Sequence, residues 1–393
     1  MGQKIKNIEK AAERIKKAVK NNERIILYGD SDLDGISSVV ILEEAIKNLG
    51  GHIDCAFFPD RENDGYGINL RALEMLEEKA PAVLITLDLG IGNVEEIEMA
   101  NKMGFEVIIV DHHEPLEKIP DAFLIVDPKS GDDPYSFKGL ANVGITFNLC
   151  MELLGDPSPR GPQGTLISQN LKNSFLELAA LGTISDMVPQ TDQNQEIIEQ
   201  GLRSLKNTFR PALRAFLDIL GDGKVFEESL PKIISALNAA ESVKFENETY
   251  LLLTSSDKKQ CSEMAQGLLG KNQHKQILVK NIVQEIERRV SQKSDELIIF
   301  EGDPSWKLTL AGSVASIICN KYEKPSFIFK KMDKESCGSV RNPKGMNSVE
   351  AMKECNGFLM TYGGHAQASG FRLKNEHLDK FRDCLSNYFK KYK

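Results

Sequence analysis

Short apolar runs alternate with longer amphipathic segments over the first 154 residues. The runs at 23–28, 82–87 and 105–110 are typical of buried strands, because they are short, continuous and followed by turn or polar residues. The segments at 36–49 and 94–103 have the helical spacing of apolar positions. Further elements of the same two kinds are expected as strands at 52–58 and 123–126 and as a helix at 69–79. The alternation predicts an α/β fold with a mostly parallel sheet and helices on both faces.

The rest of the chain has a different pattern. A Pro/Gly-rich loop is expected at 156–164 and a turn at 221–224. Helices are expected at 166–182, 193–221, 229–240 and 257–291, and then at 313–321, 348–355 and 376–388. Strands are expected at 296–300, 308–311, 326–329, 335–341 and 366–373. We therefore expect three parts, which are an α/β domain at 1–190, a helical connector at 191–292 and an α+β domain at 293–393.

Acidic and imidazole side chains follow three of the predicted strands. They are Asp30, Asp32 and Asp34 after the first, Asp88 after the second, and Asp111, His112 and His113 after the third. In a parallel sheet these strand ends share one edge, where ligands bind. A single aspartate would be enough to cap a helix, whereas three carboxylates on one turn repel one another unless cations neutralise them. The pattern predicts a metal site.

Asp186, in GTISDMVP, is a further candidate ligand. Carboxylates combined with imidazoles suit Mn²⁺ and, less strictly, Mg²⁺, and the lack of a thiolate cluster argues against zinc. Two such ions sharing one carboxylate can activate a water for displacement at phosphorus. Asp88 has the central place in sequence order that a shared ligand needs. Asp127 is interpreted as a turn residue.

A second group of candidate residues lies in the last hundred positions. The segments are SCGSVR, which contains Ser339 and Arg341, and YGGHAQASGF, which contains Gly363, Gly364 and His365. The glycine pair is expected to form a turn whose N–H groups bind an anion, with arginine and histidine as added donors. An ordinary turn and a solvated arginine are the alternative reading.

The composition of the chain limits the binding partners and the cellular compartment that are expected for it. The net charge of −8 means that a nucleic acid would have to be held by a local basic patch or by metals. Seven cysteines without zinc spacing suggest reduced thiols in a cytoplasm. The charged amphipathic N-terminus lacks the apolar core of a signal peptide, and no apolar run reaches about 18 residues, so no membrane association is expected.

The ordered motifs resemble the DHH phosphoesterases. They are DSDLDG, LDLGIGN, DHHEP and GTISDMVP, and GGHAQASGF resembles the signature of the DHHA1 domain. The resemblance implies an active-site cleft between the two domains and two Mn²⁺ or Mg²⁺ ions. It implies that Asp32 and Asp34 each hold one ion, that Asp88 bridges them, and that His112 and Asp186 complete the shells. His113 would stabilise charge at the scissile phosphate, with Asp30 and Asp111 as ligands or orienting groups.

Within the family the motifs look most like those of RecJ-type exonucleases. Related pyrophosphatases carry histidine where this chain has Tyr28. The length, with no room for an OB-type domain after DHHA1, is similar to that of archaeal RecJ-like and GINS-associated nucleases. The resemblance implies that Ser339, Arg341, Gly363, Gly364 and His365 grip the substrate's phosphate or terminal nucleotide.

The implied function is metal-dependent, single-strand-specific exonuclease activity on DNA, with RNA as an open alternative, in replication or repair. Candidate partners are single-stranded nucleic acid, GINS and the replicative helicase. Two other functions stay open. One is cleavage of very short RNA or of cyclic dinucleotides by a phosphodiesterase of the same family, and the other is a replisome scaffold bound to GINS.

Overall fold

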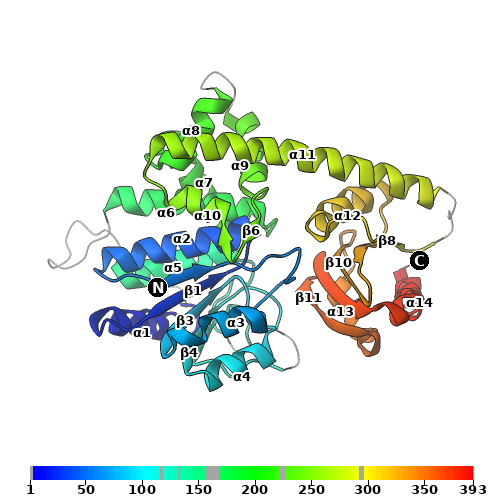
Figure 1. The fold of residues 1–393 in the computed structure, drawn as a ribbon, viewed down its shortest axis with the longest axis horizontal. Coiled ribbons are helices and arrows are strands. Elements are labelled where there is room, and N and C mark those ends of the chain that lie inside the picture. Colours follow the sequence, from blue (N-terminus) through cyan, green and yellow to red (C-terminus); the bar gives the residue numbers. More distant parts are fainter. Residues whose placement is uncertain are drawn as a thin grey trace. The chain divides into compact units, whose positions relative to one another are not determined.

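The structure is a computed structural model that describes residues 3–115, 118–131, 133–155, 168–221, 226–291 and 296–392. Two compact units are present (Figure 1). The first contains Met1–Asp60 and Tyr66–Asn272, and the second contains Arg61–Gly65 and Gln273–Lys393. The loop expected at 156–164 and most of the turn at 221–224 lie outside the described residues. The three-part division of the chain stays a prediction.

The first unit is built on a five-stranded sheet in the order β2-β1-β3-β4-β5. Its strands are β1 (Ile25–Gly29), β2 (Cys55–Phe57), β3 (Ala82–Leu87), β4 (Phe105–Val110) and β5 (Leu124–Val126). All of the pairings are parallel. The predicted parallel sheet is confirmed, and the acidic segments that follow β1, β3 and β4 therefore share one edge.

Alternate residues of the strands serve two separate cores. Ile25 and Leu27 point to a core with helices α1 (Ile8–Lys20), α2 (Leu33–Asn48), α5 (Asn142–Leu154) and α6 (Gln169–Ser185). Ile26 and Tyr28 point to a core with α3 (Leu70–Leu76) and α4 (Val94–Lys102). The helices thus cover both faces of the sheet, as predicted (Figure 1).

The segment expected to be a helical connector is helical. Its elements are α7 (Asp192–Leu205), α8 (Pro211–Leu220), α9 (Phe226–Leu237), α10 (Glu248–Thr254) and α11 (Lys258–Val290). A short hairpin of β6 (Ser242–Val243) and β7 (Glu246–Asn247) was not predicted. Short 3-10 helices lie at Glu77–Lys79, Asn356–Phe358, Asn375–His377 and Lys390–Tyr392.

The second unit has a five-stranded sheet in the order β11-β12-β10-β9-β8. Its elements are β8 (Ile299–Asp303), α12 (Leu308–Tyr322), β9 (Ser326–Lys331), β10 (Glu335–Arg341), α13 (Ser348–Glu354), β11 (Leu359–His365), β12 (Ala368–Lys374) and α14 (Leu378–Phe389). Only the β8–β9 pairing is parallel within this sheet of the described chain. The mixed sheet with flanking helices confirms the predicted α+β class.

Two predictions for the second unit are wrong. Residues 308–311 form the start of α12 rather than a strand, because the buried positions Leu310, Ala311, Val314 and Ala315 continue one helical stripe. The glycine pair does not form a turn. It lies within β11, a strand that was not predicted, and the turn falls at residues 366–367.

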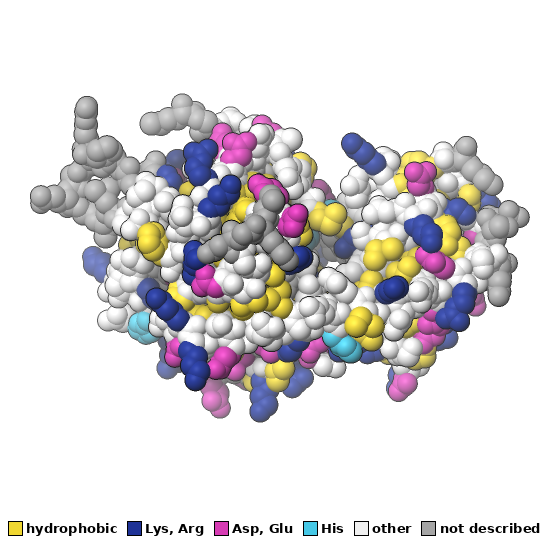
Figure 2. All heavy atoms as spheres, turned by 90° about the horizontal axis from the view of Figure 1, so that it is seen from above, with side chains coloured by type: hydrophobic (Ala, Val, Ile, Leu, Met, Phe, Trp, Pro, Cys, Tyr) yellow, Lys and Arg dark blue, Asp and Glu magenta, His cyan; other side chains and the backbone are white. Residues whose placement is uncertain are grey.

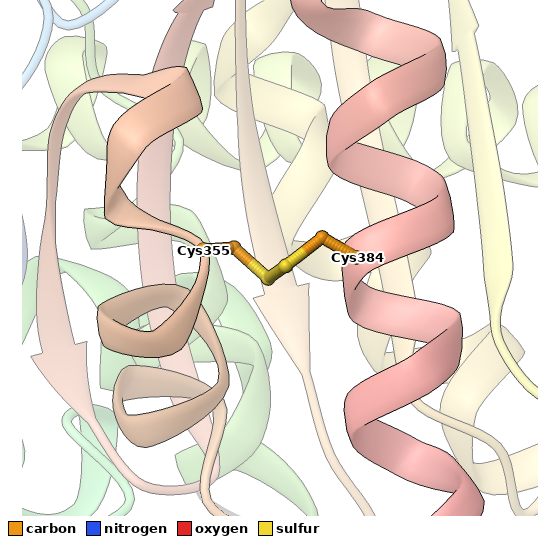
Figure 3. Close-up of a disulfide and its surroundings, with 2 residues drawn as sticks. All are labelled: Cys355 and Cys384. Atoms are coloured by element: carbon orange, nitrogen blue, oxygen red, sulfur yellow. A yellow bond between two sulfur atoms is a disulfide. The ribbon is translucent and has the colours of Figure 1, made fainter.

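The expectation of uniformly reduced thiols is also wrong. Cys355, just after α13, forms a disulfide with Cys384 on α14 (Figure 3). The two positions are 29 residues apart and become neighbours only when the helices pack side by side. Sequence spacing therefore offered no sign of the pair.

The charges on the surface and the composition of the helices bear on whether the chain can bind charged partners or cross a membrane. Figure 2 shows acidic and basic side chains intermingled on the face that it draws. No helix within the described ranges combines the length and the apolar composition needed to cross a lipid bilayer.

Candidate metal centre

The turn after β1 packs the beginning of α2 tightly against the end of the strand. Asp32 caps the helix, because its Oδ1 accepts a hydrogen bond of 3.0 Å from the Gly35 N–H. A β-carbon on Gly35 would lie only 2.6 Å from the Asp30 carbonyl oxygen. Glycine is therefore required for this close approach, which brings the carboxylates of the turn together.

Asp34 is fully buried beneath the N-terminus of α5. Its Oδ2 accepts the Asn142 N–H at 2.8 Å, and its Oδ1 accepts the Val143 N–H at 2.7 Å. Burial and the nearby Asp32 charge together raise the pKa of Asp34 to about 7. The helix terminus orients this carboxylate and partly compensates its charge.

Asp88 occupies the centre of the acidic cluster. It follows β3 with a backbone φ of 66°, a left-handed conformation that costs energy for a residue other than glycine. Burial, followed by repulsion from Asp34 and other carboxylates, raises the pKa of Asp88 well above its usual range. Among the described residues, none forms a hydrogen bond with its buried Oδ1. Such an atom needs a proton or a cation.

His112 presents a ring nitrogen to these carboxylates. Burial and the charge of His113 hold the pKa of His112 well below its usual value, so the ring is neutral. Its Nδ1 lies 3.0 Å from the Leu140 carbonyl oxygen and donates to it, which assigns the lone pair to Nε2. That Nε2 lies 3.1 Å from Asp88 Oδ1 and 3.6 Å from Asp186 Oδ2.

The close approach of His112 Nε2 to Asp88 Oδ1 is what a site for a divalent cation requires. A lone pair that faces a carboxylate oxygen at 3.1 Å is repulsive unless a positive charge lies near both atoms. A proton on Asp88 can supply that charge when no metal is bound, and a hard cation replaces it when metal binds. The oxygen-rich donor set with an imidazole fits Mn²⁺ or Mg²⁺.

Asp111 orients the neighbouring histidine. Its Oδ1 accepts hydrogen bonds from the N–H groups of His112 and His113, and its Oδ2 accepts the Ile91 N–H. His113 Nδ1 lies 2.7 Å from Oδ1. Burial would raise the pKa of Asp111, but His113 outweighs it and lowers the value to about 2. Burial likewise opposes charge on His113, and Asp111 raises its pKa overall.

Within the first unit, three sets of donor atoms among the described residues lie close enough to hold an ion. They are Asp34, His112 and Asp186; Asp30, Asp32 and Asp88; and Asp88, Asp111 and His113. Within each set the donor atoms lie within 4.8 Å of one another. Asp88 belongs to two sets and is 3.1 Å from His112, a member of the third. All of the candidate residues predicted in the first unit are thus brought to one place.

Sequence reasoning missed two residues of this centre. The Tyr66 hydroxyl donates to the Asp88 carbonyl oxygen at 3.0 Å and lies 3.1 Å from His113 Nδ1. Tyr66 stands in a segment that was read only as turn-rich. Asn142 is the second, and nothing in its sequence context pointed to a metal centre. Asp127 accepts the Lys129 N–H as a turn residue would, although burial and Asp111 raise its pKa to about 8.

The second unit brings four of its five predicted substrate residues onto one face of the sheet. Ser339 of β10 pairs with Gly370 of β12, which in turn pairs with Gly363 of β11. Arg341 pairs with Ala368, which pairs with His365. Directly paired residues on neighbouring antiparallel strands project to the same side. The small residues Ala368 and Gly370 of β12 lie between the four predicted contacts, and α12 packs beside Ser339 and Arg341 on this face.

Gly364 has another role. Its neighbours in β11 project to the face that carries Ser339 and Arg341, and Gly364 itself has a φ of 121°. A β-carbon there would lie 2.7 Å from the Ala368 carbonyl oxygen. The residue is therefore needed for close strand packing rather than as part of an anion-binding turn.

Comparison with known proteins agrees with this organisation. Residues 24–183 match the N-terminal domain of the DHH family, and residues 294–391 match the DHHA1 domain. The chain contains a DHH-family N-terminal domain and a DHHA1 domain, as the resemblance of its motifs implied.

Its relatives include proteins named RecJ. The single-stranded-DNA-specific exonuclease RecJ of Bacillus subtilis is 33% identical over 389 residues, which are 97% of this chain. The chain spans about half of that relative, 48% of its length. A crystal structure of exonuclease RecJ bound to manganese is 26% identical with a TM-score of 0.76, and the match covers 98% of this chain and 95% of that one. RecJ of Thermus thermophilus in complex with Mn²⁺ is 25% identical with a TM-score of 0.78, over 98% of this chain and 55% of that one.

Proposed function

We propose that this chain is a metal-dependent exonuclease that hydrolyses phosphodiester bonds at an end of single-stranded DNA. The observation that carries the proposal is the neutral Nε2 of His112 facing the buried carboxylate of Asp88 at 3.1 Å, amid further carboxylates. The relatives named RecJ supply the substrate class. Their complexes with manganese support the choice of metal.

Two Mn²⁺ or Mg²⁺ ions would be held by the residues predicted from the motifs. One ion would lie among Asp34, His112 and Asp186, and the other would lie beside Asp32, with Asp88 shared between them. Ions bound in this way lower the pKa of a coordinated water and neutralise charge on the phosphate. Asp30 is within reach of the second ion as a further ligand or orienting group.

His113 is proposed to act on the substrate rather than on the metals. Asp111 holds its Nδ1 and raises its pKa against the opposing effect of burial, which favours the protonated ring. With Nδ1 held in this way, Nε2 is the atom that can donate to a phosphate oxygen in the transition state. The His113 side chain is 17% exposed, compared with 1% for His112, which agrees with a position at the substrate-facing edge of the centre.

The sheet face that carries Ser339, Arg341 and His365 in the second unit is proposed to bind the substrate. Arg341 can pair with a phosphate through its planar guanidinium, and Ser339 and His365 supply further donors. A β-carbon on Gly312 of α12 would lie 3.3 Å from Arg341 Nη2, so glycine leaves room for this side chain. Gly363 has open space beside it, which lets a ligand approach the strand closely.

The test is hydrolysis of an end-labelled single-stranded 20-mer in Mn²⁺ by the wild type and by Asp88→Asn. Asparagine tolerates the left-handed backbone of Asp88 and cannot serve as a charged bridge between two cations. We expect a loss of about 10³-fold or more in kcat, because both proposed ion positions depend on this carboxylate. The matched control is Asp218→Asn on the surface of α8, which should keep full activity. Near-normal activity of Asp88→Asn would contradict the proposed site.

The same assay separates the alternatives. Parallel reactions with duplex DNA, single-stranded RNA and a dinucleotide test the preference for single-stranded DNA. Much faster cleavage of the dinucleotide than of the 20-mer would replace the proposal with a phosphodiesterase of short or cyclic substrates. A GINS-containing partner, a role in replication and a cytoplasmic location stay predictions from the motif resemblance and from composition.

A further inference from the structure

Asn142 lies in the core of the metal centre although it offers no charge. It is the first residue of α5 and is completely buried. Its backbone N–H donates to Asp34 Oδ2 at 2.8 Å. Its side chain reaches the main chain at the ends of β3 and β4. A buried amide that sits between two sheet strands and a helix must satisfy its polar atoms there.

The surrounding groups fix the orientation of this amide. With Nδ2 toward β4, it donates to the Val110 carbonyl oxygen at 3.0 Å, and Oδ1 accepts the Asp88 N–H at 2.9 Å. The opposite orientation would place two acceptors together at Val110 and two donors together at Asp88. The Ser38 hydroxyl lies 3.0 Å from Oδ1 and 2.9 Å from the Asp34 carbonyl oxygen, so its single proton can serve either.

Asn142 therefore contacts two buried carboxylate residues of the centre by different routes. It contacts Asp34 through its backbone and the Asp88 main chain through its side chain. Asp88 has the left-handed φ of 66°, and its N–H is shared between Val110 and the Asn142 amide. An amide supplies both a donor and an acceptor without adding charge to a crowded acidic cluster.

We propose that Asn142 is a positioning residue that holds Asp88 in its strained conformation and sets its placement relative to Asp34. The inference rests on the proposed metal site, because it assigns these two aspartates to neighbouring ions. Without the amide, the Asp88 main chain loses one of its two acceptors and relaxes toward ordinary backbone angles. The two carboxylates then no longer match the spacing that a pair of cations needs.

The test is calorimetric titration of Mn²⁺ into the metal-stripped full chain, without substrate. Asn142→Ala keeps the backbone N–H that serves Asp34 and removes only the amide. We expect a Mn²⁺ dissociation constant about 10-fold to 100-fold above that of the wild type, the usual effect of losing an orienting partner. The matched control is Asn148→Ala on the same helix, whose amide pairs with Gln193 instead. Its Mn²⁺ affinity should stay within about twofold of the wild type.

Thermal unfolding in EDTA separates positioning from plain stability. Asn142→Ser, which keeps a small polar side chain, is a second variant that decides the question if the alanine variant does not fold. Unchanged Mn²⁺ affinity in a folded Asn142 variant overturns the inference, even if the variant is less stable. A wild type that binds no Mn²⁺ overturns the proposed metal site itself, so the two failures are distinguishable.

Discussion

Burial sets the protonation state of the central carboxylates before any cation binds. Asp34 and Asp88 both have raised pKa values because they are enclosed and repelled by neighbouring acids. Asp111, equally buried, has a lowered pKa because it accepts several hydrogen bonds and pairs with His113. Aspartate therefore has two roles here, and the environment of each residue decides which it has. Asp34 and Asp88 are ligands for which a proton competes with the metal, whereas Asp111 is a charged group that orients its neighbour.

This difference predicts a pH-dependent metal affinity. The pKa of Asp34 in the folded chain is about 7, above its ordinary value of 3.8, so the metal-free fold holds a proton between these pH values. A cation must displace that proton. Through Asp34 alone, the apparent Mn²⁺ affinity should therefore rise by up to about tenfold per pH unit below 7, and the raised pKa of Asp88 adds to this dependence. Titration calorimetry at pH 6, 7 and 8, in buffers that differ in ionisation enthalpy, measures both the affinity and the proton release. An affinity that is flat over this range would contradict the assignment of Asp34 as a proton-competed ligand.

The same shift has a consequence for metal-free stability, with a definite sign. Because the raised pKa belongs to the folded state, the contribution of Asp34 to stability is fully present below about pH 4 and is lost as the pH rises through 7. Mn²⁺ bound beside Asp34 would offset this loss.

The second unit shows where the local pattern of residues was sufficient to predict a helix or a strand and where it was not. The predicted range of β10, 335–341, is confirmed to the residue. A strand is expected from the sequence at residues 308–311, because a short, mostly apolar segment fits either structure. The neighbouring turn of α12 decided the outcome by extending a buried helical stripe.

The helix pair α13 and α14 leads to a prediction about stability. The Cys355–Cys384 disulfide closes a loop with a sequence separation of 29, which in the chain-entropy model stabilises the fold by about 3–4 kcal/mol. Urea unfolding of the wild type with and without dithiothreitol should show a difference of this order. The difference should vanish in Cys384→Ser and persist in Cys337→Ser, which removes a thiol outside the disulfide. Equal stability with and without reductant would mean that the pair is not bonded in solution.

At the scale of the whole molecule, the two compact units are not two continuous stretches of the sequence. Arg61–Gly65 follows β2 of the first unit in sequence but belongs to the second unit. Glu62 accounts for this, because it accepts the Thr309 N–H at 3.1 Å and pairs with Lys330 at 2.6 Å. The chain passes from one unit to the other on each side of this segment and again after Asn272.

Removal of the lysine partner should release this segment. Lys330→Met leaves the segment's own sequence unchanged, and both side chains of the lost pair are partly exposed, so we expect a loss of only about 1 kcal/mol. This corresponds to a roughly fivefold faster cleavage after Arg61 by limiting trypsin, followed by mass spectrometry. Lys331→Met, at the exposed neighbouring position, is the matched control. Equal cleavage rates in both variants would show that the Glu62–Lys330 pair does not hold the segment.

The sequence by itself determined the strand and helix pattern of the first unit and the placement of acids directly after β1, β3 and β4. Both are local properties, because hydrophobic periodicity and strand-end residues are read within a few positions. The shared edge of a parallel sheet then made the meeting of Asp34, Asp88 and His112 predictable.

Only the tertiary structure decided how these groups behave. The neutral form of His112 depends on its burial, and the position of its ring proton depends on its contact with Leu140. This contact, the hydrogen bonds of Tyr66 and the contact of the Asn142 amide with Asp88 connect residues that are 22 to about 54 positions apart in the sequence. The pairing of two cysteines has the same origin. Such features depend on burial and on packing between distant elements, which no local pattern of residues encodes.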